Sequence, residues 1–162
     1  IGLFIQYISS LFGADIDVFN LGEYARFYAG DICRHLKDEI DTMGAQALIP
    51  VPLHASRERE RGYNQSELLA KEMSRLLGIP VRSDIVKRVQ KTVPQKELDE
   101  LGRQNNLKKA FFIGTDVVKL KKVIVVDDVY TTGSTVDAVA RELKEHGVGK
   151  VYFITLCIGE GI

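Results

Sequence analysis

Two adjacent acids and a run of hydroxyl residues stand close together late in the sequence. Asp127 and Asp128 directly follow the apolar residues 123–126, and residues 131–135 place hydroxyl side chains on both sides of Gly133. Hydroxyls and exposed backbone N–H groups at the start of a helix form an anion site, aided by the positive end of the helix dipole. A glycine lets the backbone approach the anion closely. We therefore expect a phosphate site in this turn.

The paired acids predict a second kind of contact beside that phosphate. Carboxylates do not bind a phosphate directly, but they suit the vicinal hydroxyls of a ribose, or a divalent cation held on those hydroxyls. The competing interpretation is a capped helix after a buried strand, with solvated acids, because Thr and Ser are common caps. A Walker A loop is excluded, since its glycine-lysine pattern is missing and no lysine lies in the turn.

The run of residues 123–135 resembles the phosphoribosyl-pyrophosphate signature of type I phosphoribosyltransferases. The resemblance implies that Asp127 and Asp128 are the catalytic acids, which address the ribose hydroxyls and hold Mg²⁺ indirectly, through those hydroxyls or through water. It also implies that five residues of the turn bind the 5-phosphate of the substrate: Thr131, Thr132, Gly133, Ser134 and Thr135.

Residues 50–65 carry a second pattern, with a Pro-Val-Pro-Leu-His strand end, an arginine-rich turn and a Gly-Tyr-Asn-Gln helix start. This pattern resembles the ComF family of competence proteins, a branch of the phosphoribosyltransferase-like proteins. A third segment supports the same family by its spacing of Arg, Thr, Gln, Leu, Arg and Asn: Arg88, Thr92, Gln95, Leu98, Arg103 and Asn106. The four-cysteine zinc module with which many ComF relatives begin is not among these 162 residues.

Under this resemblance the start of the second pattern is the pyrophosphate loop, whose backbone N–H groups and Arg57 guanidinium pair with phosphate oxygens. Its residues are Leu53, His54, Ala55, Ser56 and Arg57. For His54, a structural or orienting role is favoured over that of a catalytic base. Arg59 and Arg61 also fit a solvated, self-neutralising turn, and Asn64 and Gln65 also fit a helix cap and a first-turn residue.

Residues 90–106 are predicted to form a flexible loop that closes over the site and excludes water. Lys91, Lys96 and Arg103 would bring positive charge to the leaving pyrophosphate, and Gln95 lies in the same loop. A simple mobile surface loop is the competing interpretation.

The bulk composition narrows the remaining possibilities. Lys plus Arg and Asp plus Glu both number 22, so the net charge is zero and gives no general attraction to nucleic acid or anionic membrane. Cys33 and Cys157 are far apart, which favours two buried free thiols over a zinc site or disulfide and fits a cytoplasmic location. No apolar run reaches the roughly 18 residues that a transmembrane helix needs.

Hydrophobic spacing predicts the elements that position these residues. Helices are expected over residues 20–43, where Tyr24 and Tyr28 begin an apolar stripe, and over 64–77, with another after Gly133; strands are expected over 47–53, 122–126 and 151–158. The strand-turn-helix-strand order predicts an α/β fold, a parallel sheet flanked by helices and type I phosphoribosyltransferase-like (Rossmann-like). We expect an N-terminal helical region over residues 1–46 and the phosphoribosyltransferase-like domain over 47–162.

Two functions follow from the resemblance. The first is an enzyme that binds phosphoribosyl pyrophosphate with Mg²⁺ and transfers the phosphoribosyl group to an unknown nitrogen acceptor. The second is a non-catalytic binding module in DNA uptake during natural competence, which handles single-stranded DNA beside competence-machinery proteins. The basic residues 57–61 and 87–109 suit a phosphate backbone, whereas net neutrality argues against it. The apolar first helix is a candidate homodimer contact.

Overall fold

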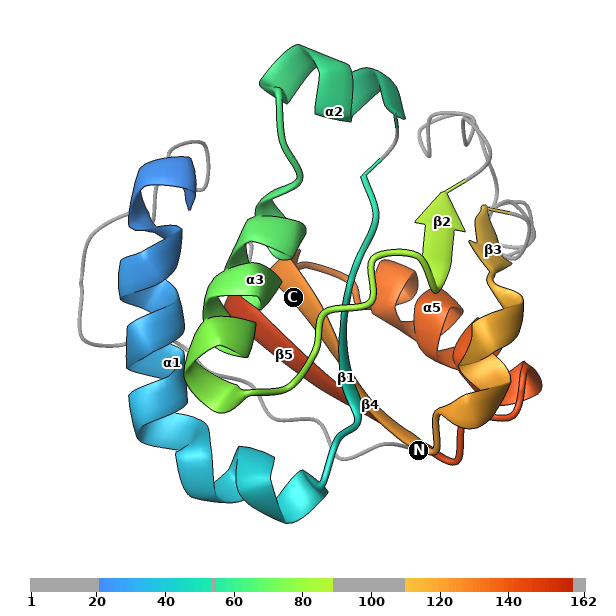
Figure 1. Cartoon of the computed structure of the whole chain (residues 1–162). Coiled ribbons are helices and arrows are strands. Elements are labelled where there is room, and N and C mark those ends of the chain that lie inside the picture. Colours follow the sequence, from blue (N-terminus) through green and yellow to red (C-terminus); the bar gives the residue numbers. More distant parts are fainter. Residues whose placement is uncertain (1–20, 54, 89–109, 159–162) are drawn as a thin grey trace.

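The computed structural model describes residues 21–53, 55–88 and 110–158 of the chain (Figure 1). Its centre is a parallel sheet in the order β1-β4-β5, formed by β1 (Ala47–Pro50), β4 (Lys122–Tyr130) and β5 (Lys150–Ile158). The strands are apolar without alternation because both faces of the sheet are covered, as in other parallel sheets. The predicted α/β architecture is confirmed.

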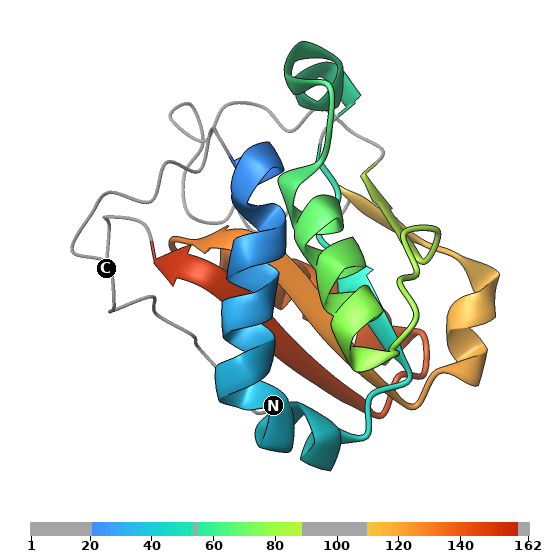
Figure 2. The ribbon, with the colours of Figure 1, turned by 60° about the vertical axis from the view of Figure 1, so that its left-hand side comes forward.

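Helices cover the two faces of the sheet. On one face, α1 (Leu21–Met43) and α3 (Gln65–Leu77) lie side by side, as Figure 2 shows. On the other face lies α5 (Ser134–Glu145). Successive residues of β4 therefore enter different cores: Ile124 packs with residues of α1 and α3, and Val125 packs with residues of α5. This sandwich holds the carboxyl ends of the strands at one edge, where the site lies.

The predicted helices agree well with α1 and α3. Helix α1 ends at Met43, before Gly44 with φ +59°, and Gly78 with φ +71° caps the end of α3. The apolar stripe of α1 buries Ile32 and Ile40 completely, but Tyr24, which the stripe also included, is half exposed. The residues of this stripe are therefore more exposed near the beginning of α1 than in its middle and end. Within the described part of the chain, no helix combines the length and apolarity needed to cross a bilayer.

A small antiparallel ribbon lies beside the main sheet. It consists of β2 (Val86–Arg88) and β3 (Phe111–Ile113), and the 3-10 helix η3 (Thr115–Lys119) follows it. Neither β3 nor η3 was predicted. The predicted flexible-loop residues fall between the two strands of the ribbon and lie outside the described residues: Gln95, Lys96 and Arg103. The roles given to them stay predictions.

The structure corrects both strand ends that bear on the site. Strand β4 was expected to stop before the acids, yet it continues through them to Tyr130, because β5 keeps pairing with it as far as Tyr130 and Ile158. Strand β1 was expected to run to residue 53 and ends at Pro50. Proline has no N–H to donate to a sheet ladder, so the Pro-Val-Pro sequence ends the strand early.

The arginine-rich segment that was predicted to be a turn is the helix α2 (Ala55–Arg61). Its Glu and Arg residues are good helix formers, and Gly62, with φ +83°, follows its end. No residue of α2 is buried, and in Figure 1 the helix stands beyond the edge of the sheet. The predicted pyrophosphate loop is therefore partly wrong in structure, since Ala55, Ser56 and Arg57 belong to the first turn of a helix.

Candidate functional site

The acid pair lies near the carboxyl end of β4. Asp127 is buried, and its Oδ1 accepts a hydrogen bond from Ser66 Oγ at 2.9 Å and another from the backbone N–H of Asp128 at 3.0 Å. Asp128 is more open to solvent. Asp127 is therefore fixed from within the protein, whereas Asp128 is only partly buried.

Burial raises the pKa of Asp127 well above its ordinary value of 3.8, and the adjacent Asp128 carboxylate raises it further. The hydrogen bond from Ser66 acts in the opposite direction. A buried acid at the edge of a sheet is costly to the fold, and strongly shifted acids of this kind gather at functional sites. This electrostatic cost supports a functional assignment over that of solvated acids beside a helix cap.

The first turn of α3 joins the acids to the end of β1. Asn64 is the N-cap of α3, and its Oδ1 accepts from the backbone N–H of Ser66 at 3.0 Å. Its Nδ2 donates to the carbonyl of Val51 at 3.0 Å. The prediction of Asn64 as a helix cap is confirmed. Ser66 was missed, because a serine two residues after a cap carries no signal in the sequence until its partner Asp127 is known.

The predicted phosphate loop is a turn between β4 and α5. Thr131 and Thr132 are exposed, and Thr132 Oγ1 shares a hydrogen bond of 2.8 Å with Ser134 Oγ. Gly133, with φ +76°, is the N-cap of α5 and has no side chain with which to cap the helix. The Ser134 N–H donates to Thr132 Oγ1 at 3.4 Å. The first turn of α5 thus presents its backbone N–H groups beside four hydroxyl side chains, which is the arrangement expected for an anion site.

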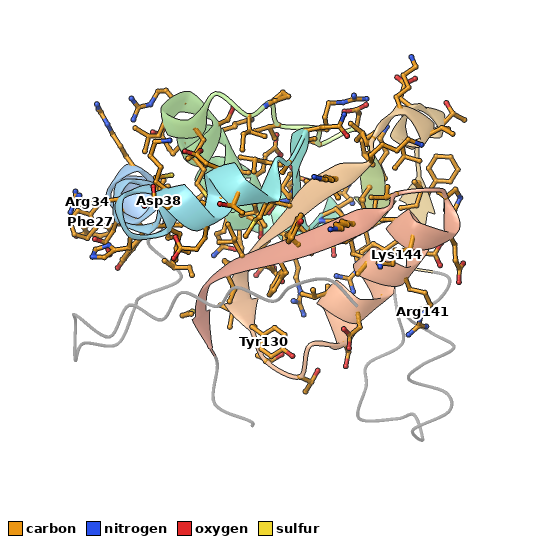
Figure 3. The ribbon with its side chains drawn as sticks, turned by 90° about the horizontal axis from the view of Figure 1, so that it is seen from below. Phe27, Arg34, Asp38, Tyr130, Arg141 and Lys144 are labelled. Carbon is orange, nitrogen blue, oxygen red and sulfur yellow. The ribbon has the colours of Figure 1, made fainter. Side chains whose placement is uncertain are left out.

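Tyr130 lies against this turn, as Figure 3 shows. Its ring packs on Phe153 with 5.9 Å between ring centroids. A Cβ on Gly133 would come within 2.9 Å of Tyr130 Cζ, so both the backbone angle and the neighbouring ring require a glycine. A cavity of about 20 Å³ connects Asp127 to the turn, and its lining residues are Asp127, Val129, Tyr130, Thr131, Gly133, Thr135 and Val136.

Such a volume holds about one water molecule. A phosphate group at this turn would therefore bind at the rim of the cavity, where the exposed Thr131 lies.

A larger cavity of about 300 Å³ lies at the carboxyl end of β1. Leu53 and Ala55 of the predicted pyrophosphate loop line it, and Ser56 and Arg57 follow on α2. His54 lies outside the described residues. The cavity also has two carboxylates and two cations in its wall: Glu58, Glu67, Lys87 and Arg88.

Arg88 is a site residue that the predicted pyrophosphate group did not include. It ends β2, where it lies partly buried with its guanidinium 5.6 Å from the centre of the Phe111 ring. Burial lowers the pKa of Arg88, Arg57 lowers it further, and Asp127 opposes the shift. Arg88 thus brings a positive charge near the buried acid, and Arg57 lies close enough to Arg88 to lower its pKa. The spaced Arg, Thr, Gln, Leu, Arg and Asn pattern includes Arg88 and was the one sequence signal for this residue. It did not indicate that Arg88 lies at the pyrophosphate end of the predicted site.

The other arginines of α2 have partners within the protein. Arg59 Nε donates to the carbonyl of Ala55 at 3.2 Å, and Arg61 donates to Gln65 Oε1 at 2.6 Å. These contacts support the structural interpretation of Arg59 and Arg61 and leave Arg57 as the candidate ligand of α2.

Both cysteines are free thiols; Cys33 is buried as predicted, whereas Cys157 is only partly buried. Burial raises the pKa of Cys33 and of Cys157 to about 11. Cys157 lies beside the site, where its Sγ donates to the carbonyl of Asp128 at 3.5 Å. Over the described ranges, no group of three His, Cys, Asp or Glu side chains could enclose a metal ion.

The fold and this site define the class of protein. Residues 64–160, more than half of the sequence, match the family model of the phosphoribosyl transferase domain. The chain belongs to this family, which confirms the class that the acid pair and hydroxyl turn predicted.

Curated relatives point to one branch of the family. The chain is 43% identical over 108 residues to competence protein F of Haemophilus influenzae, a match that covers 65% of this chain and 47% of that protein. It is 39% identical over 110 residues to the DNA utilization protein YhgH of Escherichia coli K12, covering 68% and 48% of the two chains. Competence protein ComFC of Bacillus subtilis is 35% identical over 101 residues, covering 62% and 39%.

These matches confirm the resemblance to the ComF family, and the chain spans about half the length, or less, of these curated relatives. Among solved structures, a purine phosphoribosyltransferase from Pyrococcus horikoshii is 18% identical with a TM-score of 0.45, covering 96% of this chain and 77% of that one.

Proposed function

We propose that the chain binds phosphoribosyl pyrophosphate together with Mg²⁺ and transfers the phosphoribosyl group to an acceptor, with release of pyrophosphate. The observation that carries this proposal is the placement of an acid pair, of which Asp127 is buried, and a glycine-capped helix start on one strand-turn-helix unit. An acid pair alone suits many ligands, and a helix start alone suits any anion. Together they suit a sugar that carries both vicinal hydroxyls and a phosphate.

We propose a place for each part of the ligand. The 5-phosphate would lie at Thr131, Thr132 and the first turn of α5. The ribose hydroxyls would face the acids of β4. The pyrophosphate would extend toward the positive charges of Arg57 and Arg88, since Arg88 lies within electrostatic range of both Arg57 and the buried Asp127. Arginine is suited to this role because its planar fork pairs with two phosphate oxygens at once.

In the proposed reaction, the bond from the sugar C1 to pyrophosphate breaks and a bond from the acceptor nitrogen to C1 forms. Pyrophosphate leaves with the electron pair, and the nitrogen releases a proton. Little acid-base chemistry is asked of the protein, so orientation by the acids and charge stabilisation by the arginines would supply the rate.

Two neighbouring carboxylates fit the predicted Mg²⁺ site only in part. Mg²⁺ is commonly held by one or two carboxylates together with waters and substrate oxygens, and Asp127 already has its Oδ1 occupied by two donors. The residues therefore suit a cation that is held largely by the ligand itself. When bound, Mg²⁺ would neutralise charge on the pyrophosphate.

The test is direct. The protein is incubated with phosphoribosyl pyrophosphate, Mg²⁺ and a panel of nucleobases and amines, and pyrophosphate release is measured. Release that depends on one acceptor supports the enzyme, provided that the Asp127→Ala, Asp128→Ala double variant shows none. Calorimetric titration that detects no binding to the wild-type protein would overturn the proposal.

The names of the relatives, competence protein and DNA utilization protein, support a second candidate that involves DNA. This candidate is a cytoplasmic binding module in DNA uptake that handles single-stranded DNA. Its structural support is α2, which stands beyond the sheet with no buried residue and exposes Arg57 and Arg59. The expected result is a salt-dependent gel shift of single-stranded DNA that an Arg57→Ala, Arg59→Ala variant weakens. Tight binding of phosphoribosyl pyrophosphate without turnover, together with that shift, would favour the module over the enzyme.

A further inference from the structure

A continuous path of hydrogen bonds crosses the site through the first turn of α3. It runs from the carbonyl of Val51 to Asn64, from Asn64 to the backbone N–H of Ser66, and from the Ser66 hydroxyl to Asp127. The side chains along the path are buried, with residue exposures of 8% for Asn64, 3% for Ser66 and 8% for Asp127. A path so enclosed restricts the rotamers of its members, because each group would lose a buried partner on moving.

The path fixes the orientation of one carboxyl group. Asp127 Oδ1 receives two donors, the Ser66 hydroxyl and the backbone N–H of Asp128, and these fill the two lone pairs of that oxygen. With Oδ1 held in this way, the plane of the carboxyl group is set. The Asp128 side chain also contacts this carboxyl group, and the second oxygen of Asp127 is the one assigned to a ligand hydroxyl. The other donor is the backbone N–H of Asp128, which a side-chain substitution does not remove. Ser66 is therefore the donor that mutagenesis can test.

The helix cap does not account for the Ser66 hydroxyl. The cap of α3 is made by Asn64 Oδ1 and uses the backbone N–H of Ser66, whereas the hydroxyl points to a strand 61 residues away in sequence. An alanine at this position would keep the cap. The hydroxyl therefore serves Asp127 and not the helix.

We propose that Ser66 is a positioning residue that holds the Asp127 carboxyl group for recognition of a ribose hydroxyl, and that Asn64 holds Ser66 in place from the end of β1. This inference rests on the proposed function, since it assigns Asp127 to the ribose. It goes further than that function because it assigns the sugar selectivity of the site to the first turn of α3. This turn lies in sequence between the predicted pyrophosphate loop and the predicted phosphate loop.

The experiment compares two probes that differ by one hydroxyl, ribose 5-phosphate and 2-deoxyribose 5-phosphate, each titrated calorimetrically with Mg²⁺ present. The wild-type protein is expected to prefer the ribose compound by about tenfold, the worth of one hydrogen bond to a charged group. In Ser66→Ala this preference falls toward one, while affinity for the deoxy compound stays within about twofold. Ser66→Thr, which keeps the hydroxyl, restores the preference.

Ser74→Ala is the matched control, because it removes the same group from the last turn of the same helix. It is expected to keep the wild-type preference. Thermal unfolding confirms that each variant is folded. If the alanine variant fails to fold, Ser66→Cys carries the test, since a thiol of similar shape is a weaker donor and must also lower the preference.

The outcomes separate this inference from the proposed function. A wild-type protein that binds both sugars equally contradicts the ribose contact itself and removes the basis of both. A wild-type preference that survives in Ser66→Ala overturns the positioning role alone. Equal loss of both ligands in Ser66→Ala also overturns it, because it would show that the serine supports the fold of the site and not the sugar contact.

Discussion

Arg88 lies over the ring of Phe111, with 5.6 Å from its guanidinium carbon to the ring centre, and its buried Nε has no partner among the described residues. The ring supports the cation without neutralising it. A partly buried guanidinium with donor capacity to spare, beside a second arginine and a cavity of about 300 Å³, is suited to an anionic ligand.

We predict that Arg88→Met weakens binding of phosphoribosyl pyrophosphate by roughly ten- to hundredfold, because one charge-assisted contact is lost. Binding of ribose 5-phosphate, which lacks the pyrophosphate, is expected to change less than twofold. Calorimetry on both ligands checks this. Arg75→Met is the control, since Arg75 is exposed on α3 and pairs with Glu72. If Arg88→Met weakens binding of both ligands equally, Arg88 does not contact the pyrophosphate group.

Asp127→Asn is predicted to stabilise the fold while abolishing ligand binding. Because the pKa of Asp127 is raised in the folded state, the unfolded chain ionises first as pH increases from about 3.8. The contribution of this group to the free energy of unfolding is therefore highest below pH 3.8, and it falls as pH rises from there through the folded-state pKa of Asp127. The asparagine variant does not titrate, so its advantage in the free energy of unfolding should grow with pH. Urea denaturation at several pH values measures this, and an advantage that shrinks with pH contradicts it.

Gly133→Ala is predicted to cost about 1–3 kcal/mol, the usual strain of a residue other than glycine at positive φ. The added methyl group also meets Tyr130, so ligand binding should fall with stability. Gly30→Ala is the matched control. It lies in α1 with no atom near the added Cβ, and it should stabilise the protein by about 0.5–1 kcal/mol. Thermal or chemical denaturation of the two variants should give changes of opposite sign.

Cys157 is predicted to report on ligand binding through its reactivity. A pKa of about 11 leaves little thiolate at pH 8, so alkylation should be slow and should accelerate as pH approaches 11. Bound ligand should slow it further because Cys157 contacts the carbonyl of Asp128. Cys33 has a similar pKa but lies in the core between α1 and the sheet, so it is the internal control. Ligand protection equal at both thiols would indicate global stabilisation.

Much of the sheet could be predicted from the sequence because its strands are buried on both faces and read as unbroken apolar runs. The site at β4 was also predictable, because ligands of parallel α/β sheets bind at the carboxyl ends of the strands, beside the start of the next helix. That rule did not determine where the strand ends, because the acids stay within the ladder only through pairing with β5, a tertiary contact.

Two other features escaped the sequence for distinct reasons. Alternating arginines and glutamates suit a solvated turn and an exposed helix equally, and the helix propensity of these residues decided in favour of α2. Ser66 and Arg88 depend on contacts between segments far apart in the chain, and no local pattern reports such contacts.

The continuation of β4 to Tyr130 has a consequence for how the site can diverge. The acids are anchored by a backbone ladder on the β5 side, whereas the hydroxyl turn begins only after that ladder ends. Thr131 and Thr132 can therefore be exchanged for residues of different chemistry without moving the carboxyl groups, while Gly133 is kept. A redesigned chain could in this way accept a sugar with another anionic substituent while still recognising its ring.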